Sequence, residues 1–269
     1  METSCSTIHS VDTDLSEKFV VAGCEDSILR LFTIKDLSLE LLYELSGHSG
    51  TITKVLFINQ GELIASSDFN GKLILWKLEG TVFVKKSETQ VHSGPIYDIS
   101  VRYSDKEVTV FCGCDGGLLK TVSFDSSLKT TITEQEIHKY GVISVSCNNE
   151  YIVTGGLDCV VCLLTKDGVE HLKHHQGAVN AVALSPGLPN NKDDFMLATC
   201  SEDGKLFLIK KSNENVSNQE IDLGEPAYSL DWSRTGFTIT VAYGKNKYKS
   251  FAVNGEDKFE EVSMEKVEK

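Results

Sequence analysis

The sequence predicts an all-β fold, a six-bladed β-propeller, and three observations support this prediction. Turn-like stretches recur along the 269-residue chain, the segments between them have the composition of short β-strands, and no run shows the period of an amphipathic helix. The successive spacings between the turns are 44, 45, 43, 45 and 42 residues, and such a period with four strands per unit is typical of propeller blades. The turns are centred on Asp26, Asn70, Asp115, Asp158, Asp203 and Lys245.

Each repeat divides into short strand-like segments. The second repeat contains TITKVLFI, ELIASS, KLILWKL and TVFVKK, and the fifth contains AVNAVAL, FMLATCS and KLFLIKK before a weaker fourth segment. These segments are rich in β-branched and large apolar residues, and Gly, Asn, Asp or Ser separates them. We therefore predict one domain, residues 1–269, with blades at approximately 7–46, 47–90, 91–136, 137–173, 174–223 and 224–265.

The composition narrows the classes of function. The chain is 41% hydrophobic and 24% charged, and its net charge of −13 argues against direct binding to nucleic acid or to an anionic membrane surface. It has no run of 18 apolar residues, and its first ten residues, METSCSTIHS, lack the basic and apolar regions of a signal peptide. The eight cysteines lie mostly in predicted strands, where they replace small apolar residues, which favours a reduced cytoplasmic or nuclear setting.

A histidine motif repeats with the same period as the turns. His48, His92, His138 and His175 each precede an Ile or Val by four residues. A hydroxyl residue also stands four positions before the turn residue in three repeats, and the second repeat keeps a Trp. This combination resembles the WD-repeat propellers, whose His, hydroxyl, turn acid and Trp form one hydrogen-bonded chain within a blade. The predicted network residues are His48, Ser66, Asn70 and Trp76 in repeat 2, His138, Thr154 and Asp158 in repeat 4, and His175, Thr199 and Asp203 in repeat 5.

A structural role for this network is favoured over catalysis, because buried polar side chains must be hydrogen-bonded and a repeated network satisfies them in each blade. Other motifs are weaker. Cys159 and Cys162 lie three residues apart in a predicted strand and would point to opposite faces, and His171, His174 and His175 have no fixed acidic or Cys partner. We predict no catalytic residue, no cofactor and no metal site.

The ends of the chain carry the main indication of function. The first repeat opens with its own strand, TIHSVDT, and only METSCS precedes it, so every blade is predicted to form from contiguous sequence. Most propellers instead close their ring with a strand from the other end of the chain. We therefore predict an open seam between blades 1 and 6, at which a partner adds a blade. The predicted seam residues are Ile8 and Val11 of blade 1, and Tyr228, Leu230 and Trp232 of blade 6.

Six stretches in order, with the open ends, carry a resemblance along nearly the whole chain. They are LLYELSGHSGTITKV, ASSDFNGKLILWK, VHSGPIYDISV, HKYGVISVS, YIVTGGLDCVVCLL and AYSLDWSRTGF. The chain resembles the small six-bladed WD-repeat propeller of the COPII vesicle coat, which is also a subunit of the outer ring of the nuclear pore. The resemblance implies a non-enzymatic scaffold subunit in transport from the endoplasmic reticulum to the Golgi.

The resemblance also implies partners and a location. The partners would be a helical-solenoid subunit, the rod protein of the COPII outer cage, and an outer-ring nucleoporin, each inserting a blade in trans. No direct nucleic-acid contact is expected, and contact with the membrane would be indirect. The implied location is the cytoplasmic side of the endoplasmic reticulum, COPII vesicles and the nuclear pore, with a cytosolic pool; some family members also serve a nutrient-signalling complex.

Three alternatives remain open at this stage. The first is the related propeller of the nuclear pore only, which also accepts a blade from a solenoid partner. The second is a closed WD-repeat ring that binds peptides as a general scaffold. The third is a propeller enzyme whose active site is assembled from dispersed loops.

Overall fold

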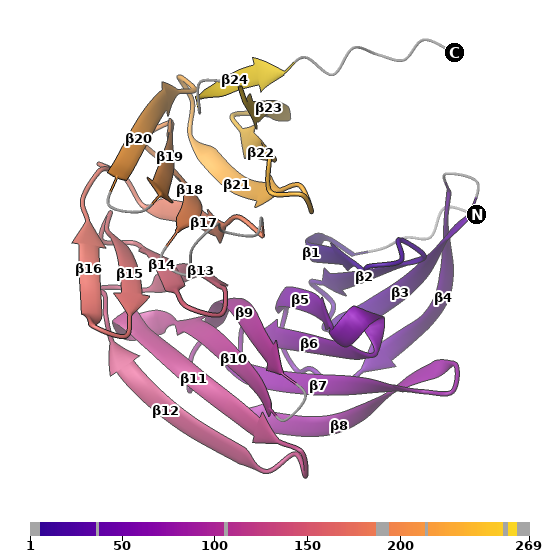
Figure 1. Ribbon diagram of the computed structural model, residues 1–269. Coiled ribbons are helices and arrows are strands. Elements are labelled where there is room, and N and C mark those ends of the chain that lie inside the picture. The colour runs from indigo at the N-terminus through magenta and orange to yellow at the C-terminus, as the bar shows by residue number, and fades with distance from the viewer. Residues whose placement is uncertain are drawn as a thin grey trace. The chain divides into compact units, whose positions relative to one another are not determined.

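The computed structural model describes residues 6–35, 38–104, 107–186, 194–212, 215–254 and 258–262, and over these residues the fold is all-β. The strands form six four-stranded antiparallel sheets, and the helical elements described are two single 3-10 turns, η1 (Asn59–Gly61) and η2 (Asp115–Gly117) (Figure 1). Each sheet consists of four strands consecutive in sequence. This confirms the predicted six-bladed fold class and the prediction that each blade is built from contiguous sequence.

The chain comprises two compact units, residues 1–136 and 137–269, with three blades in each. In unit 1, blade 1 consists of β1 (Ile8–Thr13), β2 (Phe19–Cys24), β3 (Ile28–Lys35) and β4 (Ser38–Ser46). Blade 2 consists of β5 (Ile52–Ile58), β6 (Leu63–Asp68), β7 (Lys72–Glu79) and β8 (Val82–Gln90). Blade 3 consists of β9 (Ile96–Ser104), β10 (Glu107–Cys114), β11 (Leu118–Asp125) and β12 (Thr130–Glu136). In unit 2, blade 4 consists of β13 (Val142–Cys147), β14 (Ile152–Gly156), β15 (Val161–Thr165) and β16 (Gly168–Leu172). Blade 5 consists of β17 (Val179–Leu184), β18 (Phe195–Ser201), β19 (Lys205–Ser212) and β20 (Asn215–Asp222). Blade 6 consists of β21 (Ala227–Trp232), β22 (Thr238–Tyr243), β23 (Lys247–Val253) and β24 (Phe259–Val262).

The first strand of every blade carries a β-bulge after its first paired residue. In β5 the register shifts between Ile52 and Lys54, and the other five first strands shift at the same place. A bulge changes the alternation of faces, so residues three apart across it, such as Ile52 and Val55, lie on one face. Both are fully buried and pack with Val21 of blade 1. The first strand of blade 2 therefore turns its apolar side toward the preceding blade.

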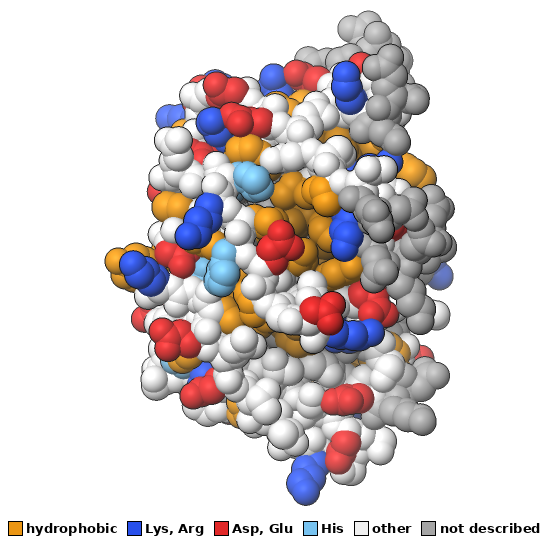
Figure 2. Space-filling view, turned by 60° about the vertical axis from the view of Figure 1, so that its left-hand side comes forward, with side chains coloured by type: hydrophobic (Ala, Val, Ile, Leu, Met, Phe, Trp, Pro, Cys, Tyr) orange, Lys and Arg blue, Asp and Glu red, His pale blue; other side chains and the backbone are white. Residues whose placement is uncertain are grey.

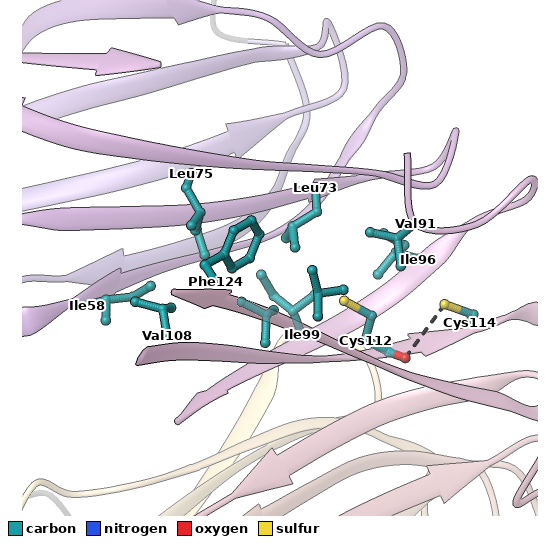
Figure 3. Close-up of a cluster of buried hydrophobic side chains, with 13 residues drawn as sticks. Ile58, Leu73, Leu75, Val91, Ile96, Ile99, Val108, Cys112, Cys114 and Phe124 are labelled. Carbon is teal, nitrogen blue, oxygen red and sulfur yellow. Dashed lines mark hydrogen bonds between the residues drawn. The ribbon is translucent and has the colours of Figure 1, made fainter. Parts of the chain in front are cut away.

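The same packing joins blades 2 and 3. Leu73 and Leu75 of β7 pack with Ile96 and Ile99 of β9, and Phe124 of β11 is 1% exposed in the same cluster (Figure 3). Burial of these apolar side chains supplies the main favourable contribution to stability. The core of each unit thus lies between adjacent blades.

One turn of blade 2 requires glycine. Gly71 has φ +80°, and a Cβ at this residue would lie 2.1 Å from the carbonyl oxygen of His92. Its own carbonyl accepts the N–H of Val91 at 2.9 Å. The turn between β6 and β7 is therefore pressed against the loop that leads into blade 3, and no side chain fits there.

The cysteines that the structure describes are all free thiols. Burial raises the pKa of the Cys114 and Cys200 thiols to about 12, so both are protonated and unreactive at neutral pH. They pack as small apolar side chains within the cores. Within the described ranges, no helix has the length and apolar character needed to cross a membrane.

Candidate functional surfaces and the buried histidine networks

Blade 4 contains a hydrogen-bonded chain of three predicted side chains. His138 Nε2 lies 2.9 Å from Thr154 Oγ1, and His138 Nδ1 lies 2.9 Å from Asp158 Oδ1. Because a carboxylate only accepts hydrogen bonds, Nδ1 carries the proton and Nε2 accepts from the Thr154 hydroxyl. Asp158 Oδ2 also accepts the backbone N–H of Lys139 at 2.9 Å. The chain ties the loop before β13 to β14 and to the turn that follows it.

Blade 5 repeats this arrangement. His175 Nε2 lies 2.9 Å from Thr199 Oγ1, and His175 Nδ1 lies 3.1 Å from Asp203 Oδ2. The same carboxylate accepts the backbone N–H of Gln176 at 2.8 Å. The ring of Phe207 packs edge-on against the imidazole, with centroids 4.8 Å apart. The predicted residues of repeats 4 and 5 are thus brought together in each blade.

Blade 2 differs from the prediction in its acid. His48 Nε2 lies 2.7 Å from Ser66 Oγ, which also accepts the indole N–H of Trp76 at 2.9 Å. The carboxylate at 2.9 Å from His48 Nδ1 belongs to Asp68, whereas the sequence argument placed Asn70 there. The amide of Asn70 instead donates to Ser49 Oγ at 3.4 Å, at an exposed position.

The repeat pattern did not indicate Asp68, because the acid was expected four residues after the hydroxyl, at residue 70. In blade 2 the acid follows Ser66 by two residues, at the last position of β6. Its Oδ1 accepts the backbone N–H groups of Asn70 at 3.0 Å and Lys72 at 2.9 Å, so it also shapes the turn. The signal in the sequence was an Asp at the end of a strand that already carries the network hydroxyl.

The protonation states suit a structural role. Burial lowers the pKa of His138 and His175, and this outweighs the opposing effect of their Asp partners, so both rings are neutral at pH 7. Burial alone would raise the pKa of Asp68, Asp158 and Asp203, but hydrogen bonds from backbone N–H groups and the His rings lower it overall. Among the described residues, no buried side-chain nitrogen or oxygen lacks a hydrogen-bond partner. Each network therefore joins the strands and turns of its own blade and satisfies the polar groups buried there.

Blade 1 fixes its turn acid with arginine instead of histidine. Arg30 is 8% exposed, and its two terminal nitrogens lie 3.0 and 2.7 Å from the two carboxylate oxygens of Asp26. Its Nε lies 2.9 Å from Glu44 Oε1. The guanidinium fork thus joins the turn after β2 to β3 and β4, as bidentate geometry favours.

Two hollows lie among the described residues. One, of about 290 Å³, lies in unit 2 and is lined by Leu208, Lys210, Ser217, Asn218, Gln219, Lys258 and Phe259. The other, of about 210 Å³, lies between blades 2 and 3, and its lining contains no His or Cys. In the part of the chain that the structure covers, no group of three His, Cys, Asp or Glu side chains could hold a metal ion. On the face shown in Figure 2, acidic and basic side chains are interspersed around a hydrophobic centre.

The first strand of blade 1 exposes an apolar surface. Ile8 is 45% exposed and Val11 is 60% exposed, and the bulge places both on the face of β1 turned away from blade 2. The residues at the same register positions in the other blades are at most 8% exposed. The residues at the register position of Ile8 are Ile52, Ile96, Val142, Val179 and Ala227. The residues at the register position of Val11 are Val55, Ile99, Val145, Val182 and Leu230. We call this surface, Ile8 and Val11, the blade 1 end face.

The predicted seam residues of blade 6 do not share one face. Tyr228 is 54% exposed, but Leu230 and Trp232 are 8% and 7% exposed and pack with Ala198 and other side chains of blade 5. The indole N–H of Trp232 donates to the carbonyl oxygen of Ala183 at 2.9 Å. Since a first strand turns its apolar side toward the preceding blade, these two residues belong to the contact between blades 5 and 6. They correct the sequence argument, which placed them at the seam.

The opposite side of blade 6 is exposed and mostly polar. Strand pairing places Ser229 beside Ala242 and Asp231 beside Thr240, and Tyr248 is the neighbour of Ala242 in β23. All five are exposed, and Tyr248 is 63% exposed. We call Ser229, Asp231, Thr240, Ala242 and Tyr248 the blade 6 end face. Small and hydroxyl side chains form most of this surface, in contrast with the apolar faces buried between blades.

Comparison with known proteins places these features in context. The family model described as "WD domain, G-beta repeat" matches residues 39–77, 128–163 and 167–210. "Protein transport protein sec13" of Aspergillus clavatus is 21% identical over 95% of this chain and 98% of its own length. "Protein SEC13 homolog" of Drosophila melanogaster is 22% identical over 96% of this chain and 81% of its own length, and "Protein transport protein SEC13-2" of Candida glabrata is 24% identical over 90% and 92%.

Proposed function

From the premise that the chain is a Sec13-like WD-repeat protein, we propose that it is a non-enzymatic scaffold subunit of a protein-transport coat. In this role it binds a helical-solenoid subunit and stiffens it. The partner contributes a β-sheet that lies against the blade 1 end face. A second assembly, the outer ring of the nuclear pore, would use the same surface.

The exposed apolar pair of blade 1 is the observation that carries the proposal. Ile8 and Val11 occupy positions that are buried in all five other blades, so blade 1 has a surface built for contact with another blade. Exposed apolar side chains on a sheet face favour association with another chain. The similarity to Sec13 proteins extends over about 95% of the chain, which supports a role like theirs.

The histidine networks support a scaffold in place of an enzyme. Their polar atoms are paired within single blades, and their carboxylates hold turns. A rigid blade with a preformed face suits a subunit that packs against a partner's sheet, because little ordering is required on binding.

Co-purification with defined partners tests this function. We would co-express the full chain with the rod subunit of the same organism's vesicle coat and, separately, with its outer-ring nucleoporins. Wild-type protein should form a stable complex with at least the coat subunit. Val11→Lys should keep the melting temperature of the free protein but lose the complex, because burying an unpaired ammonium group is costly.

Val216→Lys is the matched control, since Val216 is 65% exposed on β20, the last strand of blade 5. This variant should bind like wild type. If neither partner binds wild-type protein, the proposed function fails. If Val11→Lys binds at wild-type strength, the blade 1 end face is not the binding surface. Binding of nucleoporins alone would favour the pore-only alternative.

A further inference from the structure

The hollow of about 210 Å³ between blades 2 and 3 adjoins their shared core. Its apolar wall consists of Leu63, Val108, Phe124 and Leu128, and all four belong to that core or pack against it. Figure 3 shows Val108 toward one end of the cluster and Cys114 toward the other. The hollow therefore extends the core at the end where Val108 lies, as space that no described side chain fills.

The contact between blades 4 and 5 fills the corresponding space with two aromatic rings. Tyr151, which directly precedes β14, and Phe195, the first residue of β18, are both buried. Their ring centroids lie 5.0 Å apart, with the ring planes at 62°. An edge-on aromatic pair of this kind packs densely and is favourable in itself. The two blades are thus closed to solvent at this point.

Blades 2 and 3 have smaller side chains at the same register positions. Counted from the residue that pairs with the start of each first strand, Leu63 holds the position of Tyr151 and Val108 holds that of Phe195. Replacing two rings with two aliphatic side chains leaves room between the blades. The hollow is therefore a property of these two residues, and a side chain from another molecule has space to enter it.

Charged groups stand around this apolar wall, and most of them are acidic. The carboxylates are those of Glu62, Glu107 and Asp125, and the ammonium group is that of Lys77. None of these four side chains forms an ion pair with another described residue. The mouth of the hollow thus has an excess of negative charge that the described part of the chain does not neutralise, and it suits a cation.

Two of the carboxylates are held in place by their own turns. Asp125 Oδ1 accepts the backbone N–H groups of Ser127 at 2.8 Å and Lys129 at 2.9 Å, and Glu62 Oε2 accepts the amide N–H of Asn59 at 2.7 Å. The second oxygen of each carboxylate has no hydrogen-bond partner among the described residues. A ligand can therefore bind these oxygens at little cost in side-chain ordering.

We propose that this hollow is a docking site for one arginine side chain of a basic segment in a partner protein. The stem of an arginine packs on apolar surface while its charged end stays at a polar rim. The planar fork of N–H donors suits the carboxylates of Glu62, Glu107 and Asp125 better than a compact ammonium group does. The ring of Tyr103, also in the lining and 38% exposed, offers a surface on which a guanidinium stacks.

The size of the hollow agrees with a single side chain as the occupant. Sites for drug-sized molecules have volumes of about 300–1,000 Å³, which is larger than this one. An acidic side chain would add to the negative charge, and an apolar one would leave the carboxylates without partners. The site is formed by blades 2 and 3 alone, so the inference does not rest on the blade 1 end face or on the proposed function.

Titration of the isotope-labelled full chain, followed by nuclear magnetic resonance, tests the inference with three short peptides. The probes are acetyl-Gly-Arg-Gly-amide and the same peptide with citrulline or lysine at its centre; citrulline has the shape of arginine without its charge. The arginine peptide should shift the amide signals of Val108 and Phe124 saturably, with a Kd on the order of 1–10 mM for one side chain. The citrulline peptide should bind about 5-fold more weakly or worse, and the lysine peptide should bind more weakly than the arginine peptide.

Four variants locate the site. Val108→Phe copies Phe195 of blade 5 and should abolish binding by filling the hollow. Glu107→Gln should raise the Kd about 2- to 5-fold, as is usual for one exposed charge pair, and Lys77→Gln should lower it by a similar factor because a like charge is removed. Glu170→Gln is the matched control, since this carboxylate is exposed on β16, and it should leave the Kd unchanged.

Thermal melts show whether the variants are folded, and the two charge variants decide the question if Val108→Phe is not. Absence of saturable shifts at Val108 and Phe124 overturns the inference. Equal binding of the citrulline or the lysine peptide also overturns it, since the hollow would then not select a guanidinium. Weaker binding by Lys77→Gln would overturn it as well, because the hollow would then favour an anion. Co-purification with the rod subunit is a separate measurement, so the proposed function stands or fails independently of these results.

Discussion

In blade 2 the acid that contacts the His ring is Asp68, and it does not stand at the turn position that Asn70 occupies. In blades 4 and 5 one Asp both accepts a hydrogen bond from the His ring and caps the turn, at the fourth position after the hydroxyl. In blade 2 Asp68 does both from the second position, and it is fully buried, while the amide of Asn70 lies at the surface. The amide at residue 70 is tolerated because the carboxylate is supplied elsewhere.

The first prediction compares these two residues. Asp68→Ala should lower the free energy of unfolding by about 2–3 kcal/mol, because it leaves His48 and two turn N–H groups without their acceptor. Asn70→Ala should change it by less than about 0.5 kcal/mol, as is usual at exposed sites. Urea unfolding at pH 7.5 measures both. Equal losses in the two variants would show that residue 70 has a role that its contacts do not reveal.

The second prediction concerns pH. Burial holds the pKa of His138 and His175 below the value of about 6.5 for an unfolded His, so the unfolded chain binds protons first as the pH falls. Stability should therefore decrease as the pH drops below about 6.5. The Asp partners, whose pKa is lowered in the fold, lose their contribution only below about 4, so the two effects occur in separate ranges.

Urea midpoints between pH 7.5 and 5.0 measure this effect. Wild-type protein should change little down to about pH 6.5 and lose stability below it. His175→Gln should have a lower stability at pH 7.5 and a smaller decrease in stability over the same range. The variant lacks one imidazole whose protonation favours the unfolded chain. A pH slope identical to that of wild type would mean that His175 is not kept neutral by its environment.

At the scale of single elements, the turn between β6 and β7 depends on the space available to its glycine. Gly71 and Gly80 both have positive φ, +80° and +65°. A Cβ on Gly71 would also lie 2.5 Å from the carbonyl oxygen of Gly94, whereas a Cβ on Gly80 would meet nothing within 4 Å. The two positions therefore separate backbone strain from steric overlap.

The third prediction follows from this comparison. Gly80→Ala should cost about 1 kcal/mol, the strain of a left-handed conformation. Gly71→Ala should cost about 3 kcal/mol or more, because the loop before β9 must also move. Thermal unfolding of the two variants under one buffer condition provides the measurement. Similar losses of stability in the two variants would indicate that the loop before β9 moves at little energetic cost.

At the scale of the whole molecule, the sequence predicted the sheets better than the contacts between them. The repeat of turns and apolar segments predicted the six-bladed fold, because strand composition and turn residues are local properties. It did not predict that Ser10 and Asp12 bind the backbone of blade 2, nor that Leu230 and Trp232 face blade 5. These contacts depend on which side of a strand meets its neighbour, and one bulge reverses that side.

The fourth prediction tests the face assignment in blade 6. Leu230→Lys should destabilise the free protein by about 3 kcal/mol or more, since it places a charge among the apolar side chains shared with blade 5. Tyr228→Lys should be close to neutral, because Tyr228 is 54% exposed. Soluble yield and melting temperature compare them directly. A Leu230→Lys protein as stable as wild type would mean that this side chain faces solvent.

The placement of the two tryptophans offers an optical means of following the two units. The chain has only two Trp residues, and they divide evenly: Trp76 lies in unit 1 at 2% exposure, and Trp232 lies in unit 2 at 7%. Each indole is hydrogen-bonded inside its own unit, so its emission shifts to longer wavelength when that unit opens to water. A Trp232→Phe protein then reports on residues 1–136 and a Trp76→Phe protein on residues 137–269, without any attached dye. The difference between their denaturation midpoints measures how cooperatively the two halves of the chain unfold.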